Sequence, residues 1–100
     1  MEGETRGQRL IRAVQEHRVV ELTYQGHQRT VEPHIVGLHE AGEPVLYGYQ
    51  TGGTSRSGSI PGWRTLIVTE IEDLELTDQR FPGPRGDFDP AGLLEVFARA

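Results

Sequence analysis

The residues that come closest to a catalytic motif lie in one polar loop. Gly53-Thr54-Ser55-Arg56-Ser57 nearly matches the nucleophile elbow of serine hydrolases, but its fifth position is serine and no helix follows. Gly53 and Gly58 have the spacing of a phosphate-binding loop, but Ser59 stands where that loop requires lysine, and a strand comes next. Both motifs fail, so we expect that the protein is not an enzyme. We interpret the segment as a flexible hairpin end whose backbone amides and hydroxyls could contact a ligand.

The histidines do not form a metal-binding pattern. His17, His27, His34 and His39 show neither the i, i+4 spacing of a helix nor the i, i+2 spacing of a strand that would place two imidazoles on one metal. Glu32 and His34 share a strand face, so an acid/base pair is conceivable, but nothing near them resembles an activated nucleophile. We therefore expect a hydrogen-bonded structural pair, with neither metal nor cofactor.

Arginine is the residue type that favours an anion site. All ten basic residues are arginine, whose planar guanidinium suits phosphate or carboxylate better than an ammonium does, although a genomic composition bias would give the same lysine-free chain. The formal net charge of -5 argues against indiscriminate nucleic-acid binding. Residues 1–64 hold seven arginines and seven carboxylates, whereas residues 65–100 hold three and eight. Any anion site is therefore expected in the first two thirds of the chain.

Length and composition indicate one small domain. One hundred residues, 35% of them hydrophobic, suffice for a single core spanning 1–100. The chain has no cysteine, which excludes disulfides and thiolate metal sites. Its longest apolar runs are a few residues, against the roughly 20 that a membrane span needs, and residues 1–4 do not resemble a signal peptide. We expect a cytoplasmic protein without a membrane partner.

The first element predicted is a helix from about residue 6 to 17. Thr5-Arg6-Gly7-Gln8 has the pattern of a capping box, which marks a helix start. Apolar or aromatic residues then recur on one helical face, namely Leu10, Ile11, Ala13, Val14 and His17. The arginines at 6, 9, 12 and 18 would cover the remaining surface, where a solvated face is favoured over an anion-binding stripe.

Alternating apolar and polar residues after the helix predict five strands. The expected strands span residues 19–24, 29–38, 44–51, 63–69 and 71–76, and turns or polar loops join them. Pro33 is expected at a bulge or an edge, because proline cannot donate to a strand ladder. The pattern favours a strongly bent antiparallel sheet or a small barrel over about 18–77.

The tail, residues 78–100, is predicted to end in a short helix. Residues 81–87 contain too many prolines and glycines for regular structure, and Asp89-Pro90 resembles an N-cap followed by a first-turn proline. One face of this helix would be apolar, with Leu93, Leu94, Val96 and Phe97. It would dock on its own barrel or on a partner chain.

Several anchors spread over four expected strands resemble the WYL family. They are Arg29-Thr30-Val31-Glu32-Pro33-His34, Gly37, Pro44-Val45-Leu46-Tyr47-Gly48-Tyr49-Gln50, Gly62-Trp63-Arg64, Ile71 and Phe81. The resemblance runs from about residue 9 to 81, with the order and spacing of the anchors intact. The tripeptide that names the family is Pro44-Val45-Leu46 here, so only its leucine is kept. The chain is most similar to the short, stand-alone branch of the family, which has no DNA-reading segment.

The resemblance implies a fold and a function. The fold is a five-stranded Sm-like or SH3-like barrel preceded by a helix. Family members usually form the ligand-sensing part of bacterial transcription regulators and defence-associated proteins, and their ligands are thought to be nucleic acids or nucleotides. The implied ligand-binding residues are Arg29, His34, Tyr49 and Arg64, with Gln50 and Trp63 beside them.

Two hypotheses follow for the whole chain. The first is a module that binds a nucleotide, a short single-stranded nucleic acid or a similar anion, because arginine offers a fork to phosphate and aromatic rings offer stacking faces. The second is a protein-interaction or self-association domain without a small ligand, which docks through the tail or an exposed strand edge. Structural roles are equally open for the same residues. Tyr49 and Trp63 could be core residues, and Arg29 could pair with Glu21 across the hairpin.

Overall fold

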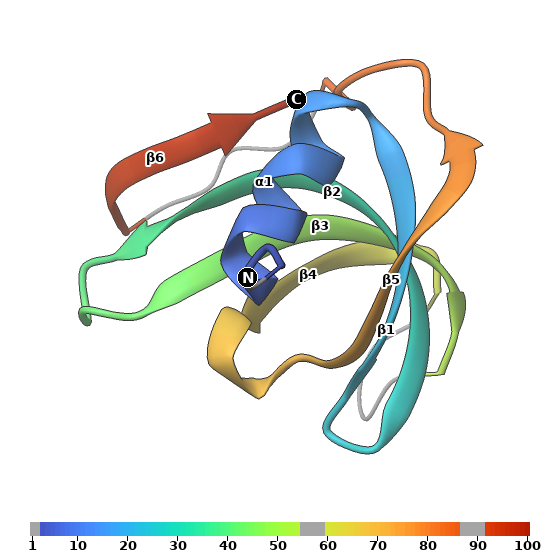
Figure 1. Cartoon of the computed structure of the whole chain (residues 1–100), viewed down its shortest axis with the longest axis horizontal. Helices are drawn as coiled ribbons and strands as arrows, with labels where there is room; N and C mark the ends of the chain where they lie inside the picture. The colour runs from blue at the N-terminus through green and yellow to red at the C-terminus, as the bar shows by residue number, and fades with distance from the viewer. Residues whose placement is uncertain (1–2, 55–59, 87–91) are drawn as a thin grey trace.

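The computed structural model of the chain describes residues 3–54, 60–86 and 92–100. One helix precedes a set of antiparallel strands (Figure 1). The elements are α1 (Arg6–Gln15), β1 (Arg18–Tyr24), β2 (His27–His39), β3 (Pro44–Gly53), β4 (Gly62–Ile67), a 3-10 helix (Val68–Glu70), β5 (Glu72–Arg80) and β6 (Leu93–Arg99).

Helix α1 begins at the predicted capping box. The Thr5 hydroxyl accepts from the Gln8 N–H at 3.1 Å, and the Gln8 side chain accepts from the Thr5 N–H at 2.9 Å. The helix ends at Gln15, two residues before the predicted end, because His17 adopts a left-handed backbone (φ 54°) that turns the chain into β1. Leu10, Ala13 and Val14 are buried, as the apolar face requires.

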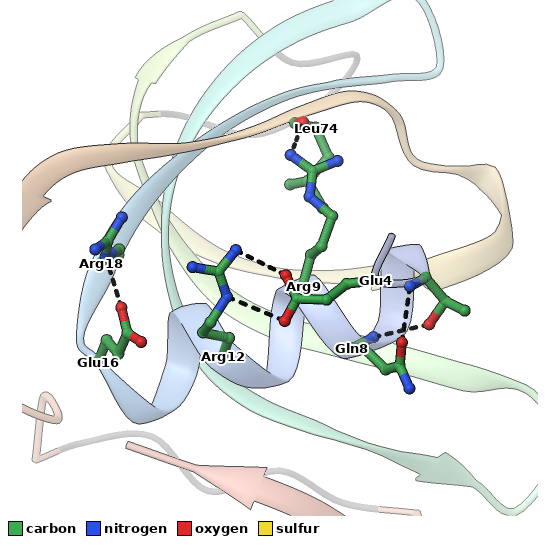
Figure 2. Close-up of polar contacts among 8 residues, drawn as sticks. Glu4, Gln8, Arg9, Arg12, Glu16, Arg18 and Leu74 are labelled. Atoms are coloured by element: carbon green, nitrogen blue, oxygen red, sulfur yellow. Dashed lines mark hydrogen bonds and ion pairs between the residues drawn. The ribbon is translucent and has the colours of Figure 1, made fainter. Parts of the chain in front are cut away.

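The helix arginines bind their own chain. Arg12 pairs with Glu4, Arg9 donates to the carbonyl of Leu74 at 2.7 Å, and Arg18 pairs with Glu16, as Figure 2 shows. Arg6 donates to the carbonyls of residues 68 and 69. These contacts link α1 to β1, the 3-10 helix and β5. Among the described residues, the arginines of this region therefore do not form an anion-binding stripe.

Strand β2 is the centre of the sheet. The order is β4-β3-β2-β1-β5, and β6 pairs with β2 as well. Because β3 occupies one edge of β2, the other edge is shared between β1, opposite residues 27–31, and β6, opposite residues 35–39. Pro33 lies between these two stretches, at a register shift, where no ladder bond needs its missing N–H. Of the two predicted positions for Pro33, a bulge or an edge, the register shift favours the bulge.

The expected barrel and tail helix require correction. There are six strands instead of five, and no closed barrel forms over the described residues, because β4 and β5 end the sheet and are joined by the 3-10 helix. Residues 93–99, predicted as helix, form β6, since the part of β2 that β1 leaves unpaired is available to a further strand. Asp89-Pro90 lies outside the described residues. Strand β5 runs on to Arg80, four residues beyond the predicted end.

Two apolar clusters define the two faces of the curved sheet. The inner face meets α1 in the main core, which contains Leu10, Ala13, Val14, Val20, Leu22, Tyr24, Val31, Val36, Leu46, Leu66, Val68, Ile71, Leu74 and Ala98. The outer face carries a smaller cluster of Ile35, Val45 and Tyr47. Because successive side chains of a strand point to opposite faces, this division places every site residue on one face or the other. Within the described part of the chain, no helix is long and apolar enough to cross a membrane.

Candidate functional site

The six predicted ligand-binding residues separate onto the two faces of the sheet. Strand alternation from Leu46 and Leu66 places Gln50 and Arg64 on the inner face, and Arg29 lies there beside Tyr24. The remaining three are on the outer face, where Tyr49 is directly opposite Trp63 and His34 contacts the Trp63 ring. They therefore make two groups, and not one continuous surface.

Arg29 is a buried cation on the inner face. Its residue is 3% exposed, and its Cζ lies 5.3 Å from the centre of the Tyr24 ring. One terminal nitrogen donates to the Tyr24 carbonyl at 3.3 Å and the other to Oε1 of Gln50 at 3.4 Å. Both distances exceed the usual range for N–H···O bonds. The Nε atom has no hydrogen-bond partner, and no carboxylate pairs with Arg29, within residues 3–54, 60–86 and 92–100.

Arg64, on the same face, adds a second positive charge that acts on Arg29. Burial lowers the pKa of Arg29, and the charge of Arg64 lowers this pKa further. Arg64 itself donates from Nη1 to the Trp63 carbonyl at 2.9 Å. A buried guanidinium whose nearby charge has the same sign is an unfavourable arrangement, which an anion bound between the two side chains would relieve.

Gln50 fixes the position of Arg29. Its side chain is fully buried, and its Nε2 donates to the carbonyls of Gly52 at 3.0 Å and Thr54 at 2.9 Å. The Oε1 atom faces Arg29, so the amide is already occupied at both ends. Gly53 adopts φ 88°, and a Cβ there would lie 2.1 Å from the Gln28 carbonyl oxygen, so this end of the hairpin requires glycine. Gln50 is a positioning residue in this arrangement.

The outer group is a packed aromatic cluster. Trp63 meets the Tyr49 ring edge-on at 5.1 Å and the His34 ring at 4.9 Å. Phe81 stacks on His34 at 5.2 Å. Arg85 covers the Tyr49 ring, with its Cζ 3.9 Å from the ring centre. Tyr49 and Trp63 are therefore half-buried residues that pack against each other. They are neither fully buried in the core nor fully exposed for stacking.

His34 is held as a neutral imidazole. It is 2% exposed, its Nδ1 lies 2.8 Å from the Glu32 carbonyl oxygen, and its Nε2 accepts from the backbone N–H of Arg85 at 3.2 Å. These bonds require the proton on Nδ1. Burial is the main cause that lowers the pKa of His34, against the opposing influence of Glu32. The hydrogen-bonded Glu32–His34 pair is present, but it uses the backbone of Glu32, whose carboxylate pairs with Arg85 at 2.9 Å.

The structure corrects one prediction from the sequence and adds one residue that the sequence did not indicate. The pairing of Arg29 with Glu21 is wrong, because Arg29 lies opposite Leu22 in the hairpin, whereas Glu21 lies opposite Thr30 and points to the other face. Arg85 was missed, because it lies in a segment rich in proline and glycine that predicted only irregular structure. The near-motif residues 55–59 lie outside the described residues, and no metal-binding group of three or more suitable side chains occurs in the part that is described.

Comparison of the chain with protein-family models, with curated proteins and with solved structures found no match.

Proposed function

We propose that the protein is a ligand-binding module that takes up an anion on the inner face of its sheet, between Arg29 and Arg64. The ligand class is a nucleotide, a short single-stranded nucleic acid or a similar phosphate-bearing molecule. The resemblance to the WYL family adds the context, a sensor in bacterial regulation or defence. The observation that carries the proposal is the buried Arg29 guanidinium, which has a second arginine nearby and no carboxylate among its described contacts.

The physical reason is the cost of a buried charge. Transfer of an ion out of water costs several kcal/mol even after a protein relaxes around it, unless an opposite charge and hydrogen bonds compensate. The Tyr24 ring and two long hydrogen bonds compensate only in part. A phosphate oxygen that accepted from both guanidiniums would supply the missing charge and short, charge-assisted bonds.

Phosphate recognition is favoured over base stacking. Tyr49 and Trp63 lie on the opposite face from Arg29, so they would not contact the group that Arg29 holds. The Tyr49 ring is moreover covered by Arg85. We therefore expect affinity to depend on the phosphate groups of a ligand and to vary little with its base.

Calorimetric titration tests this function. Wild type would be titrated with inorganic phosphate, pyrophosphate, adenosine monophosphate, adenosine triphosphate and a short single-stranded oligonucleotide, each at two chloride concentrations. Replacement of Arg29 by glutamine, or of Arg64 by alanine, should weaken binding at least about tenfold, or 1.4 kcal/mol. Lysine at either position should restore only part of the affinity, since it returns the charge without the planar fork.

Arg12→Ala is the matched control, because Arg12 is an exposed arginine paired with Glu4 on α1. It should bind every probe as wild type does. For the oligonucleotide, affinity should also fall as chloride rises, with a shallower slope in each site variant. Failure of wild type to bind any probe, or wild-type affinity in both site variants, would refute the proposed site.

Docking on another protein chain is the second candidate function. Three large apolar side chains on β6 are exposed, Leu94 at 67%, Val96 at 44% and Phe97 at 43%. They lie on a strand whose described pairing is with β2 alone, and exposed edge strands can add a strand from another chain. If this function holds, Phe97→Ser should change the elution volume of a concentrated sample in size-exclusion chromatography. The anion-site variants should leave that volume unchanged.

A further inference from the structure

Residues 81–86, which we call the strap, follow β5 and are fixed to the outer face of the sheet. Figure 1 shows this segment in orange at the end of β5. The Phe81 N–H donates to the His17 carbonyl at 2.9 Å, and the Phe81 ring stacks between His17 and His34. At the other end of the strap, Arg85 bonds to Glu32 through its side chain and to His34 through its backbone N–H.

The bond between Arg85 and His34 depends on the protonation state of His34. Nε2 can accept from the Arg85 N–H only while it carries no proton. Because Nδ1 already donates to the Glu32 carbonyl, the second proton taken up by the imidazole must go to Nε2. It would then point at another N–H group, and two donors cannot form a hydrogen bond.

We propose that His34 is a pH-sensitive latch that holds the strap on the outer face of the sheet and releases Arg85 when the imidazole becomes charged. Release of this backbone bond would leave the Arg85 guanidinium over the Tyr49 ring tethered through its solvent-exposed ion pair with Glu32. The latch thus converts acidification into loosening of the segment that covers the ring of Tyr49 beside Trp63. This inference is independent of the anion site on the inner face.

Among the described residues, four charged or titratable side chains act on His34 or lie beside it. On β2, the Glu32 carboxylate favours the charged imidazole. On the strap, Arg85 opposes it, as does His17 between α1 and β1. On β6, Arg99 lines the same small pocket as His34 and adds a further positive charge to that side. Burial opposes the charged form most, and it is the main cause that lowers the pKa of His34. The latch should therefore be closed at neutral pH and should open in mild acid, below the ordinary histidine pKa of about 6.5.

Nuclear magnetic resonance on the ¹⁵N-labelled full chain tests the latch directly. At neutral pH, the ring nitrogens of His34 should show the tautomer with the proton on Nδ1, and the Arg85 amide should show scalar coupling to Nε2 across the hydrogen bond. As the pH falls, the exchange rate of the Arg85 amide, corrected for its intrinsic pH dependence, should rise at least tenfold. The midpoint should coincide with the His34 titration, while amides in β3 stay protected.

Two histidine variants separate the latch from general acid effects. In His34→Gln, the pH-dependent change at the Arg85 amide should vanish, because glutamine does not titrate. His39→Gln is the matched control: His39 Nδ1 also accepts a backbone N–H, from Ala41 at 3.1 Å, but in an exposed turn. It should leave the Arg85 transition intact. If His34→Gln does not fold, the coincidence of the two wild-type midpoints still decides the question.

Fluorescence of Trp63, the single tryptophan, supplies a second readout. Its emission should change with the same midpoint as the His34 titration, because the indole meets the His34 ring edge-on. The proposal is overturned if the Arg85 amide stays protected through the His34 titration, if neutral His34 carries its proton on Nε2, or if the strap opens at the same pH in His34→Gln.

Discussion

Replacement of Arg29 by methionine is predicted to stabilise the fold while it removes anion binding. Methionine is about as long as the aliphatic stem of arginine, has no charge and has a flexible thioether, so it can fill the space of that stem. The substitution loses two hydrogen bonds of 3.3 and 3.4 Å, which together contribute about 1–2 kcal/mol. It also loses the contact of the guanidinium with the Tyr24 ring, which contributes about 0.5–1 kcal/mol. It also removes a cation that is 3% exposed, for which the desolvation cost is several kcal/mol. The expected net gain in the free energy of unfolding is therefore about 1–3 kcal/mol.

Urea unfolding in a buffer free of multivalent anions measures this gain. In a domain of this size, each kcal/mol should also raise the melting temperature by about 4–8 °C. Addition of pyrophosphate should then stabilise wild type by mass action, by about 2.7 kcal/mol at one hundred times its dissociation constant. It should not stabilise Arg29→Met to that extent. The difference between the two proteins cancels the general stabilisation that multivalent anions give to any fold.

Arg12→Met provides the comparison at an exposed position. Its ion pair with Glu4 is solvent-accessible, so its stability should change by no more than about 1 kcal/mol in either direction, and its response to pyrophosphate should equal that of wild type. Loss of more than about 1 kcal/mol in Arg29→Met without anion, together with equal responses of all three proteins to pyrophosphate, would refute the reasoning. Arg29 would then be a structural residue that stabilises the inner face.

Four further substitutions test the fold, its pH dependence and the absence of hydrolase chemistry. Gly37→Ala should detach or displace β6, because the new Cβ would lie 2.5 Å from the Glu95 carbonyl oxygen. Hydrogen exchange should then show less protection of the β6 amides than in wild type. Phe81→Ala should lower the free energy of unfolding by about 3–5 kcal/mol in urea titration, because the ring is 4% exposed and stacked on two imidazoles. Because the pKa of His34 is lowered in the folded state, its contribution to the free energy of unfolding should be complete above pH about 6.5 and should be lost as the pH falls through the folded-state pKa. A free energy of unfolding that does not change with pH in wild type, or that changes equally with pH in His34→Gln, would contradict this. Ser55→Ala should change no hydrolytic activity of the purified protein.

Elements with a local signal could be predicted from the sequence. The capping box of Thr5 and Gln8 determines the start of α1 through bonds within four residues, and alternation along each strand depends only on neighbouring residues. The sixth strand has no such signal. Apolar residues at 93, 94, 96 and 97 fit one face of a helix as well as a strand, and what decides between them is the edge of β2 that β1 leaves unpaired. That edge is a property of the assembled sheet.

The candidate site was predictable in part. The resemblance implies Arg29 and Arg64 among six ligand-binding residues, and the structure places both on the inner face. Strand alternation separates Tyr49 and Trp63 from the arginines, because each is adjacent in sequence to an inner-face residue. Arg85 could not have been assigned by spacing, since its position depends on the strap running from β5 to His34.

The register of β3 and β4 explains why the two short motifs Gly48-Tyr49-Gln50 and Gly62-Trp63-Arg64 occur together. They pair residue by residue, with Gly48 opposite Arg64, Tyr49 opposite Trp63 and Gln50 opposite Gly62. On the outer face, two aromatic rings meet. On the inner face, each long polar side chain lies opposite a glycine, which leaves room for it against the core. A Cβ at Gly48 would lie 2.5 Å from a Val31 methyl carbon, so the position opposite Arg64 requires glycine. The two motifs are therefore one cross-strand unit, which packs aromatic residues on one face and brings Arg64 and Gln50 to Arg29 on the other.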